Sequence, residues 1–164
     1  MRLEVGINSE DIINQETRQL IGWWVVRARN ERDPFVKMFI VYMCLDAWMT
    51  TGSGEDLDSR KLSWLKDSDN PLNKHWASAP NKKVPLNGLK GVGKIEDKRP
   101  THGGEHKYLT DTENLDQIVD FIYQIRCNLF HGGKSYVNTN DRNLCRWSAA
   151  ILQNWIEWTL AKTR

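Results

Sequence analysis

Hydrophobic residues recur along most of the chain at the three- and four-residue spacing of an α-helix. This spacing predicts a first helix over about residues 10–30, capped by Ser9, and a second that begins at Asp33-Pro34 and runs to about Met49. The second helix is apolar on nearly every side, which predicts that it lies buried at the centre of the fold. No segment alternates hydrophobic and polar residues as a β-strand does.

Two short helices are predicted next, one that begins at Asp58 or Ser59 and one within residues 71–79. Two long helices follow: one runs from Asp111 or Thr112 to Gly132-Gly133, and the other begins at a cap within residues 139–141. Residues 80–110 contain three prolines and five glycines, which predicts a long irregular loop. We therefore expect a single all-α domain over residues 1–164. It would be an up-and-down bundle of four main helices, with the loop inserted before the third.

Composition limits the class of protein. Of 164 residues, 40% are hydrophobic and 27% charged, which is the balance of a globular domain and excludes a disordered chain. The net charge of +2 gives no general attraction to nucleic acid. The three cysteines, Cys44, Cys127 and Cys145, lie in apolar helical patterns, and we expect reduced core residues. The chain shows neither a signal segment nor a membrane-spanning run, which predicts a cytoplasmic protein without membrane attachment.

Two sequence motifs resemble functional sites but lack the required context. Residues 88–95 match a phosphate-binding loop except at Ile95, where a magnesium-binding Ser or Thr is needed, and they also resemble a DNA-binding hairpin. His102-Gly-Gly-Glu-His106 matches an inverted zinc-protease motif, but its two glycines oppose the helix that such a site needs. We expect solvated loops at both, and neither a metal nor a cofactor.

The stretch Phe121–Ser135 differs from the rest of the chain because Arg126 occupies an apolar position near the end of a predicted helix. A buried guanidinium needs a partner, and we expect it in Asp46, the one acid in the second predicted helix. His131 stands directly before two glycines. These glycines allow the helix end to loosen, so that the imidazole can turn toward Arg126.

Arg126 and His131 together suit metal-independent cleavage of RNA, in which the 2′-hydroxyl attacks the adjacent phosphorus. Histidine can move the proton, and arginine, whose fork of donors fits a phosphate, can stabilise the charge of the transition state. Asn128, Lys134 and Ser135 add hydrogen-bonding groups at the same helix end, and we expect them to support substrate binding. Basic residues of the predicted loop would hold the RNA backbone: Lys82, Lys83, Lys90, Lys94, Lys98 and Arg99.

The string R-C-N-L-F-H-G-G-K at residues 126–134 resembles the R-x4-6-H signature of HEPN domains (higher eukaryotes and prokaryotes nucleotide-binding), especially the Apea-like branch. D-P-F-V-K-M-F-I-V-Y-M-C-L-D-A-W at residues 33–48 is similar to that branch's second helix, with Asp46 where Asn or Asp is usual. The resemblance implies a helical bundle that forms a homodimer through the Arg126–His131 helix, with a composite site where two such elements meet. Cys127 stands where the family often has a polar residue.

The same resemblance implies an endoribonuclease that needs no cofactor, leaves a 2′,3′-cyclic phosphate, and serves in toxin–antitoxin or antiviral defence, with an antitoxin or defence-system partner. Two other interpretations stay open. One is a non-catalytic HEPN module that dimerises and binds a nucleotide or a partner protein. The other is a plain helical scaffold, in which Arg126 is fully satisfied by Asp46 and His131 lies away from any cleft.

Overall fold

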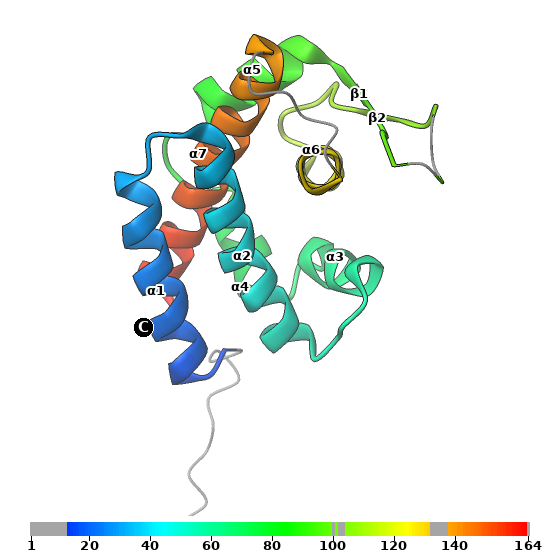
Figure 1. The fold of residues 1–164 in the computed structure, drawn as a ribbon. Coiled ribbons are helices and arrows are strands. Elements are labelled where there is room, and N and C mark those ends of the chain that lie inside the picture. The colour runs from blue at the N-terminus through cyan, green and yellow to red at the C-terminus, as the bar shows by residue number, and fades with distance from the viewer. Residues whose placement is uncertain (1–12, 100, 102–103, 132–137, 164) are drawn as a thin grey trace, which may run out of the picture.

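The structure is a computed structural model that describes residues 13–99, 101, 104–131 and 138–163. This part of the chain forms seven α-helices and one two-stranded antiparallel sheet (Figure 1). In chain order the elements are α1 (Gln15–Asn30), α2 (Pro34–Ser53), α3 (Asp58–Lys66), α4 (Pro71–Trp76), α5 (Lys83–Val92), β1 (Lys94–Glu96), β2 (His106–Tyr108), α6 (Leu115–Phe130) and α7 (Thr139–Lys162). The predicted all-α class is confirmed.

Helix α2 forms the centre of the fold, as its apolar sequence predicts. It packs against α7 along one side and against α1 along another, and half of its residues are buried. Figure 1 shows α1, α2 and α7 side by side, whereas α6 is seen end-on and crosses them. This crossing departs from a simple up-and-down bundle. It arises because α6 packs against α3 and both strands as well as against α2 and α7.

The helix starts follow local capping chemistry. The Asp33 carboxylate accepts hydrogen bonds from the backbone N–H groups of Phe35 and Val36 at 2.8 and 3.1 Å, which confirms the predicted start of α2. Helix α1 begins at a different cap, Asn14, and the predicted cap Ser9 lies outside the described residues. Asparagine caps also begin α4, α6 and α7, so the predicted Asp111 or Thr112 cap of α6 is wrong by two or three residues.

Residues 80–110 are not the irregular loop that their prolines and glycines predict. Helix α5 occupies the first part because Pro85 lies in its first turn, where a missing N–H costs nothing, and because Leu86 and Leu89 are buried. Gly88 is required where α5 packs on α7, since a Cβ there would lie 2.4 Å from the Trp147 ring. Strands β1 and β2 then pair as a hairpin, and Ile95 of β1 is buried.

Two further sequence expectations can be compared with the described residues. Cys44, Cys127 and Cys145 are all buried, as expected for core residues. Burial raises the pKa of the Cys44 thiol to about 12. Across the described ranges, we find no helix with the length and apolarity that crossing a membrane requires.

Candidate functional site

Arg126 lies on the face of α6 that packs toward α2 and α3, within a shell of aromatic rings. Its guanidinium carbon lies 4.7 Å from the ring centre of Phe130, 5.3 Å from that of Tyr42 and 5.7 Å from that of Tyr123. The side chain is 23% exposed, and its buried Nε has no hydrogen-bond partner among the described residues. The rings stabilise the cation through their faces. The outer edge of the guanidinium therefore remains available to an anion.

The carboxylate beside Arg126 is Asp58, the first residue of α3, and the expected partner Asp46 is wrong. Arg126 Nη1 lies 3.5 Å from Asp58 Oδ2, whereas Asp46 pairs with Lys61 of α3 at 3.0 Å. Helix α3 therefore supplies two partners, the Asp58 carboxylate for Arg126 and the Lys61 ammonium for Asp46. The part of the scaffold interpretation in which Asp46 satisfies Arg126 is therefore wrong, whereas its expectation for His131 stays a prediction.

Tyr123 fixes Asp58 in this position. Its hydroxyl donates a hydrogen bond of 2.9 Å to Asp58 Oδ2, the same oxygen that faces Arg126. Burial raises the pKa of Tyr123, and burial likewise raises the pKa of Tyr42, so both phenols stay protonated at neutral pH. Neither Asp58 nor Tyr123 was predicted from the sequence as part of the site. The tyrosine lies three residues before Arg126, at helical neighbour spacing, and that spacing was the available signal.

His131 is the C-terminal cap of α6, and its side chain is exposed. Its backbone N–H donates to the carbonyl of Cys127 at 3.0 Å, which is the regular helical pattern. The helix therefore stays regular up to His131, contrary to the expectation that its end loosens. Five residues of regular helix place Arg126 and His131 about 140° apart around the axis. Gly132, Gly133, Lys134 and Ser135 lie outside the described residues.

Asn128 is fully buried and acts as a structural clamp. Its Oδ1 accepts hydrogen bonds from Lys98 N and Gln124 Nε2, each at 3.0 Å, and its Nδ2 donates to Glu96 O at 2.8 Å. These contacts hold the β1–β2 hairpin on α6. They engage the amide that we expected to bind substrate, so the structure gives Asn128 a positioning role.

Replacing Asn128 with alanine is expected to lower the free energy of unfolding by about 2–4 kcal/mol, because a fully buried amide is lost together with its hydrogen bonds to three residues. Urea denaturation followed by circular dichroism measures the change. Asn87→Ala, at an exposed position of α5, is the matched control and should change stability by less than about 0.5 kcal/mol. Equal stability of the two variants would show that the clamp is not needed.

The basic residues of segment 80–100 are not equivalent. Lys82 donates to the carbonyls of Trp76 and Ala77 at the end of α4 and lies over the Trp76 ring, and burial lowers its pKa. It therefore caps a helix, contrary to the expectation that it contacts RNA. Lys83, Lys90, Lys94 and Lys98 are exposed, whereas Arg99 is partly buried and pairs with Asp97.

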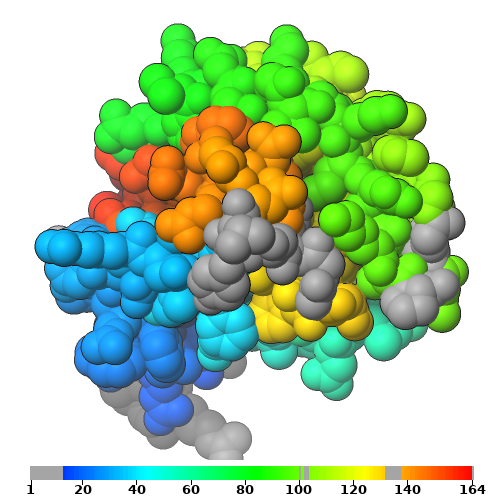
Figure 2. All heavy atoms as spheres, turned by 45° about the horizontal axis from the view of Figure 1, so that its top comes forward, coloured from blue at the N-terminus to red at the C-terminus, as the bar shows by residue number. Residues whose placement is uncertain are grey.

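An apolar surface lies beside Arg126. We call it the α2–α6 patch, and it consists of Val36, Phe39, Met43 and Phe130. Phe39 and Phe130 are 42% and 44% exposed, and their rings stack with centres 5.2 Å apart. An open groove of about 290 Å³ is lined by these two rings and by neighbouring apolar side chains. Figure 2 shows α6 (yellow) reaching the surface between α2 (cyan) and the hairpin region (green).

Neither sequence motif forms the site that its pattern suggests. Residues 88–95 run from helix α5 into strand β1, the reverse of the strand-to-helix order of a phosphate-binding loop. His106 lies on β2, with Nδ1 3.0 Å from the Gly104 carbonyl, and His102 lies outside the described residues. Within the described ranges, no three His, Cys, Asp or Glu side chains are grouped so that they could hold a metal ion.

Comparison with protein-family models, with curated proteins and with solved structures finds no match to this chain.

Proposed function

We propose that this protein is a metal-independent endoribonuclease of the HEPN type that acts as a homodimer, with Arg126 and His131 as its catalytic residues. The observation that carries the proposal is the setting of Arg126. It is a partly exposed guanidinium, anchored by Asp58 and three aromatic rings, on the helix that ends at an exposed histidine. Asp58 also accepts a hydrogen bond from Tyr123, so the arginine is held before substrate binds.

This setting suits the charge that develops during transphosphorylation. The bond from the 2′-oxygen to phosphorus forms while the bond from phosphorus to the 5′-oxygen breaks, and negative charge accumulates on the non-bridging oxygens. The fork of Arg126 can donate two hydrogen bonds to those oxygens. Because the aromatic shell excludes water on one side, each donated hydrogen bond is stronger than it would be in bulk solvent.

Two proton transfers complete the reaction, and His131 suits both. One imidazole takes the proton of the 2′-hydroxyl, and a protonated imidazole gives a proton to the departing 5′-oxygen. The products are a 2′,3′-cyclic phosphate and a free 5′-hydroxyl. A single chain offers one His131, about 140° around the helix from Arg126. A second copy of the chain would supply the other imidazole and place it on the opposite side of the RNA phosphate.

The α2–α6 patch supports a dimer that forms beside the site. Its large apolar side chains are exposed together, and patches of this kind mark protein interfaces. It includes Phe130, which directly precedes His131, so joining two patches would bring two copies of this helix end together. The dimer would then be formed through the helix that carries Arg126 and His131.

Replacing Phe39 with glutamate is expected to weaken this dimer at least about 100-fold, because a charge would be buried in an apolar contact. Analytical ultracentrifugation over a concentration series measures the dissociation constant. Leu20→Glu on α1 changes a side chain of similar exposure, 50%, away from the patch and should leave the dimer intact. Dissociation by Leu20→Glu alone would place the interface on α1 instead.

The wider role that we propose follows from the resemblance alone: a cytoplasmic toxin or defence nuclease, restrained by an antitoxin or another defence protein. Induced expression in a bacterial host should then arrest growth and fragment cellular RNA. Unimpaired growth with intact RNA, despite soluble and active protein, would count against a toxin.

The function itself is tested with purified protein and an end-labelled oligoribonucleotide in EDTA. We expect cleavage that leaves a 2′,3′-cyclic phosphate and that is unchanged when magnesium is supplied. A matched oligonucleotide with 2′-deoxyribose at the cleaved position should stay intact, because it lacks the nucleophile. No cleavage of any RNA, together with a stable dimer that binds a nucleotide, would favour the non-catalytic HEPN module.

A further inference from the structure

We propose that Arg99 of the hairpin and Arg126 of α6 form a two-arginine site that binds phosphates of the RNA backbone. The identity of its ligand rests on the proposed function, whereas the site itself is argued from the side chains. In the sequence, Arg99 is one of several basic residues of a predicted loop. The structure shows that its side chain is anchored to a buried acid, Asp97.

The hairpin brings Arg99 to α6 through specific backbone contacts. Asn128 of α6 bonds the backbone on both sides of Asp97, at Glu96 O and at Lys98 N. The Asp97 N–H in turn donates to the Glu105 carbonyl at 2.8 Å, which closes the hairpin. The chain therefore leaves β1 along the surface of α6, and Arg99 follows immediately.

Asp97 fixes the orientation of the Arg99 guanidinium. This carboxylate is only 1% exposed, and it accepts hydrogen bonds from the backbone N–H, Nε and Nη2 of Arg99. The hydrogen bonds from Arg99 hold the pKa of Asp97 well below its usual range, so the pair stays ionised at neutral pH. Nη1 has no hydrogen-bond partner among the described residues, and the side chain is 24% exposed.

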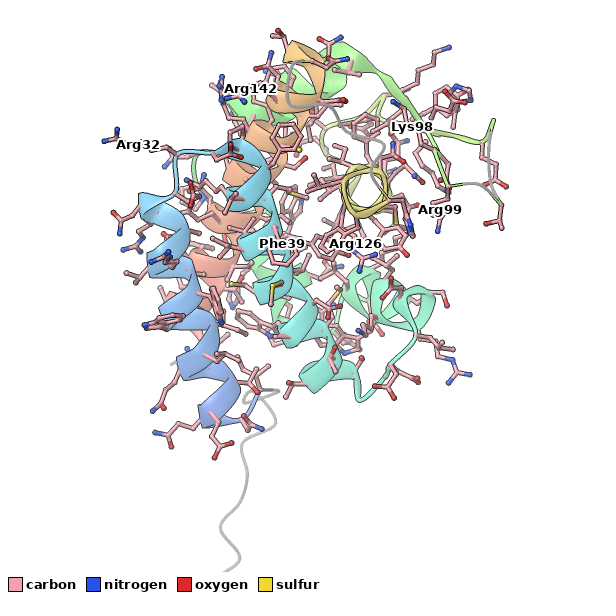
Figure 3. All side chains as sticks on the ribbon, viewed as in Figure 1. Arg32, Phe39, Lys98, Arg99, Arg126 and Arg142 are labelled. Carbon is pink, nitrogen blue, oxygen red and sulfur yellow. The ribbon has the colours of Figure 1, made fainter. Side chains whose placement is uncertain are left out.

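Arg126 and Arg99 come to one side of α6 from different elements of the fold. Arg126 lies 5.7 Å from the Tyr123 ring centre, and its Nη1 is 4.0 Å from Cys127 Sγ. Arg99 is held by Asp97, between the two backbone groups that Asn128 of α6 bonds. Figure 3 shows both guanidiniums on the same side of α6.

The arrangement is that of an anion site. Each guanidinium is held from one side by a single carboxylate, Asp97 or Asp58, and each side chain keeps about a quarter of its surface exposed. Planar forks whose orientation is already fixed lose little entropy when they bind phosphate oxygens. A consecutive stretch of RNA backbone would supply phosphates to both.

The test measures binding separately from cleavage. A fluorescent oligoribonucleotide with 2′-O-methyl groups cannot be cleaved by its own 2′-oxygen, and its affinity is followed by anisotropy across a salt series. We expect Arg99→Gln to raise the dissociation constant about tenfold and to lower the slope of log affinity against log salt by about 0.7, the value for one phosphate contact to a single strand.

Two further variants guard against a simple loss of folding. Asp97→Asn combined with Arg99→Gln removes the buried charge together with its partner and should bind as weakly as Arg99→Gln. Arg32→Gln changes an exposed arginine that Figure 3 places on the opposite side of the molecule, and it should bind as the wild type does.

Unchanged affinity and salt slope in the folded Arg99→Gln protein would overturn the two-arginine site, and so would a wild type that binds no RNA. Failure of the proposed function gives a different result. A wild type that binds the oligonucleotide and loses affinity on Arg99→Gln, yet cleaves no RNA, retains the phosphate site and refutes the nuclease.

Discussion

Replacing His131 with alanine is expected to lower the rate of RNA cleavage by about 10²- to 10⁴-fold, the range for loss of a general acid or base. The side chain is exposed at the end of α6, so its removal takes away a proton carrier without opening the core. Stability should therefore change by less than about 0.5 kcal/mol. Single-turnover cleavage of end-labelled RNA in EDTA, with thermal unfolding of the same samples, measures both quantities.

His75→Ala is the matched control, because His75 belongs to α4 and is not part of the candidate site. It should cleave at the wild-type rate. If the His131→Ala protein cleaves as fast as the control, His131 takes no part in the reaction. No proposed residue would then account for the two proton transfers.

Replacing Arg126 with glutamine is expected to lower the cleavage rate by about 10²- to 10³-fold, because the transition state loses its charge-stabilising donors. Stability should fall by about 1 kcal/mol, since the cation leaves three aromatic rings while Asp58 keeps the hydrogen bond from Tyr123. The same single-turnover assay measures the rate, and binding of the 2′-O-methyl oligonucleotide separates a loss of chemistry from a loss of affinity.

Arg126→Lys keeps the charge but lacks the planar fork, and it should remain at least about tenfold slower than wild type. Arg60→Gln is the control. Arg60 also pairs with a carboxylate, Glu55 at 3.1 Å, but on the exposed outer side of α3. Full activity of the lysine variant would mean that charge alone is required, and equal losses in Arg126→Gln and Arg60→Gln would indicate a nonspecific effect.

The long helices were predictable because their information is local. The Asp33-Pro34 start and the apolar circumference of α2 are properties of one segment, and both are confirmed. Helix α5 and the hairpin were not predictable in the same way. Proline and glycine counts suggested an irregular loop, whereas burial of Leu86, Leu89 and Ile95 against other elements decides the outcome.

The residues of the candidate site also differ in whether local sequence alone could identify them. Arg126 and His131 could be proposed from the sequence because an arginine at an apolar position and a histidine at a helix end are both local anomalies. The partners of Arg126 were not, since whether Asp46 or Asp58 reaches it depends on how α3 packs beside α2 and α6. Arg99 was recognised only as part of a basic segment, because its fixed orientation comes from Asp97 and the Asn128 clamp.

The most direct test of the account compares the wild type with the double variant Arg126→Gln, His131→Ala in EDTA on one RNA substrate. We predict that the wild type releases a fragment ending in a 2′,3′-cyclic phosphate. The double variant, folded and dimeric, should release none above the uncatalysed background. Cleavage by the double variant at the wild-type rate would contradict the assignment of these two residues.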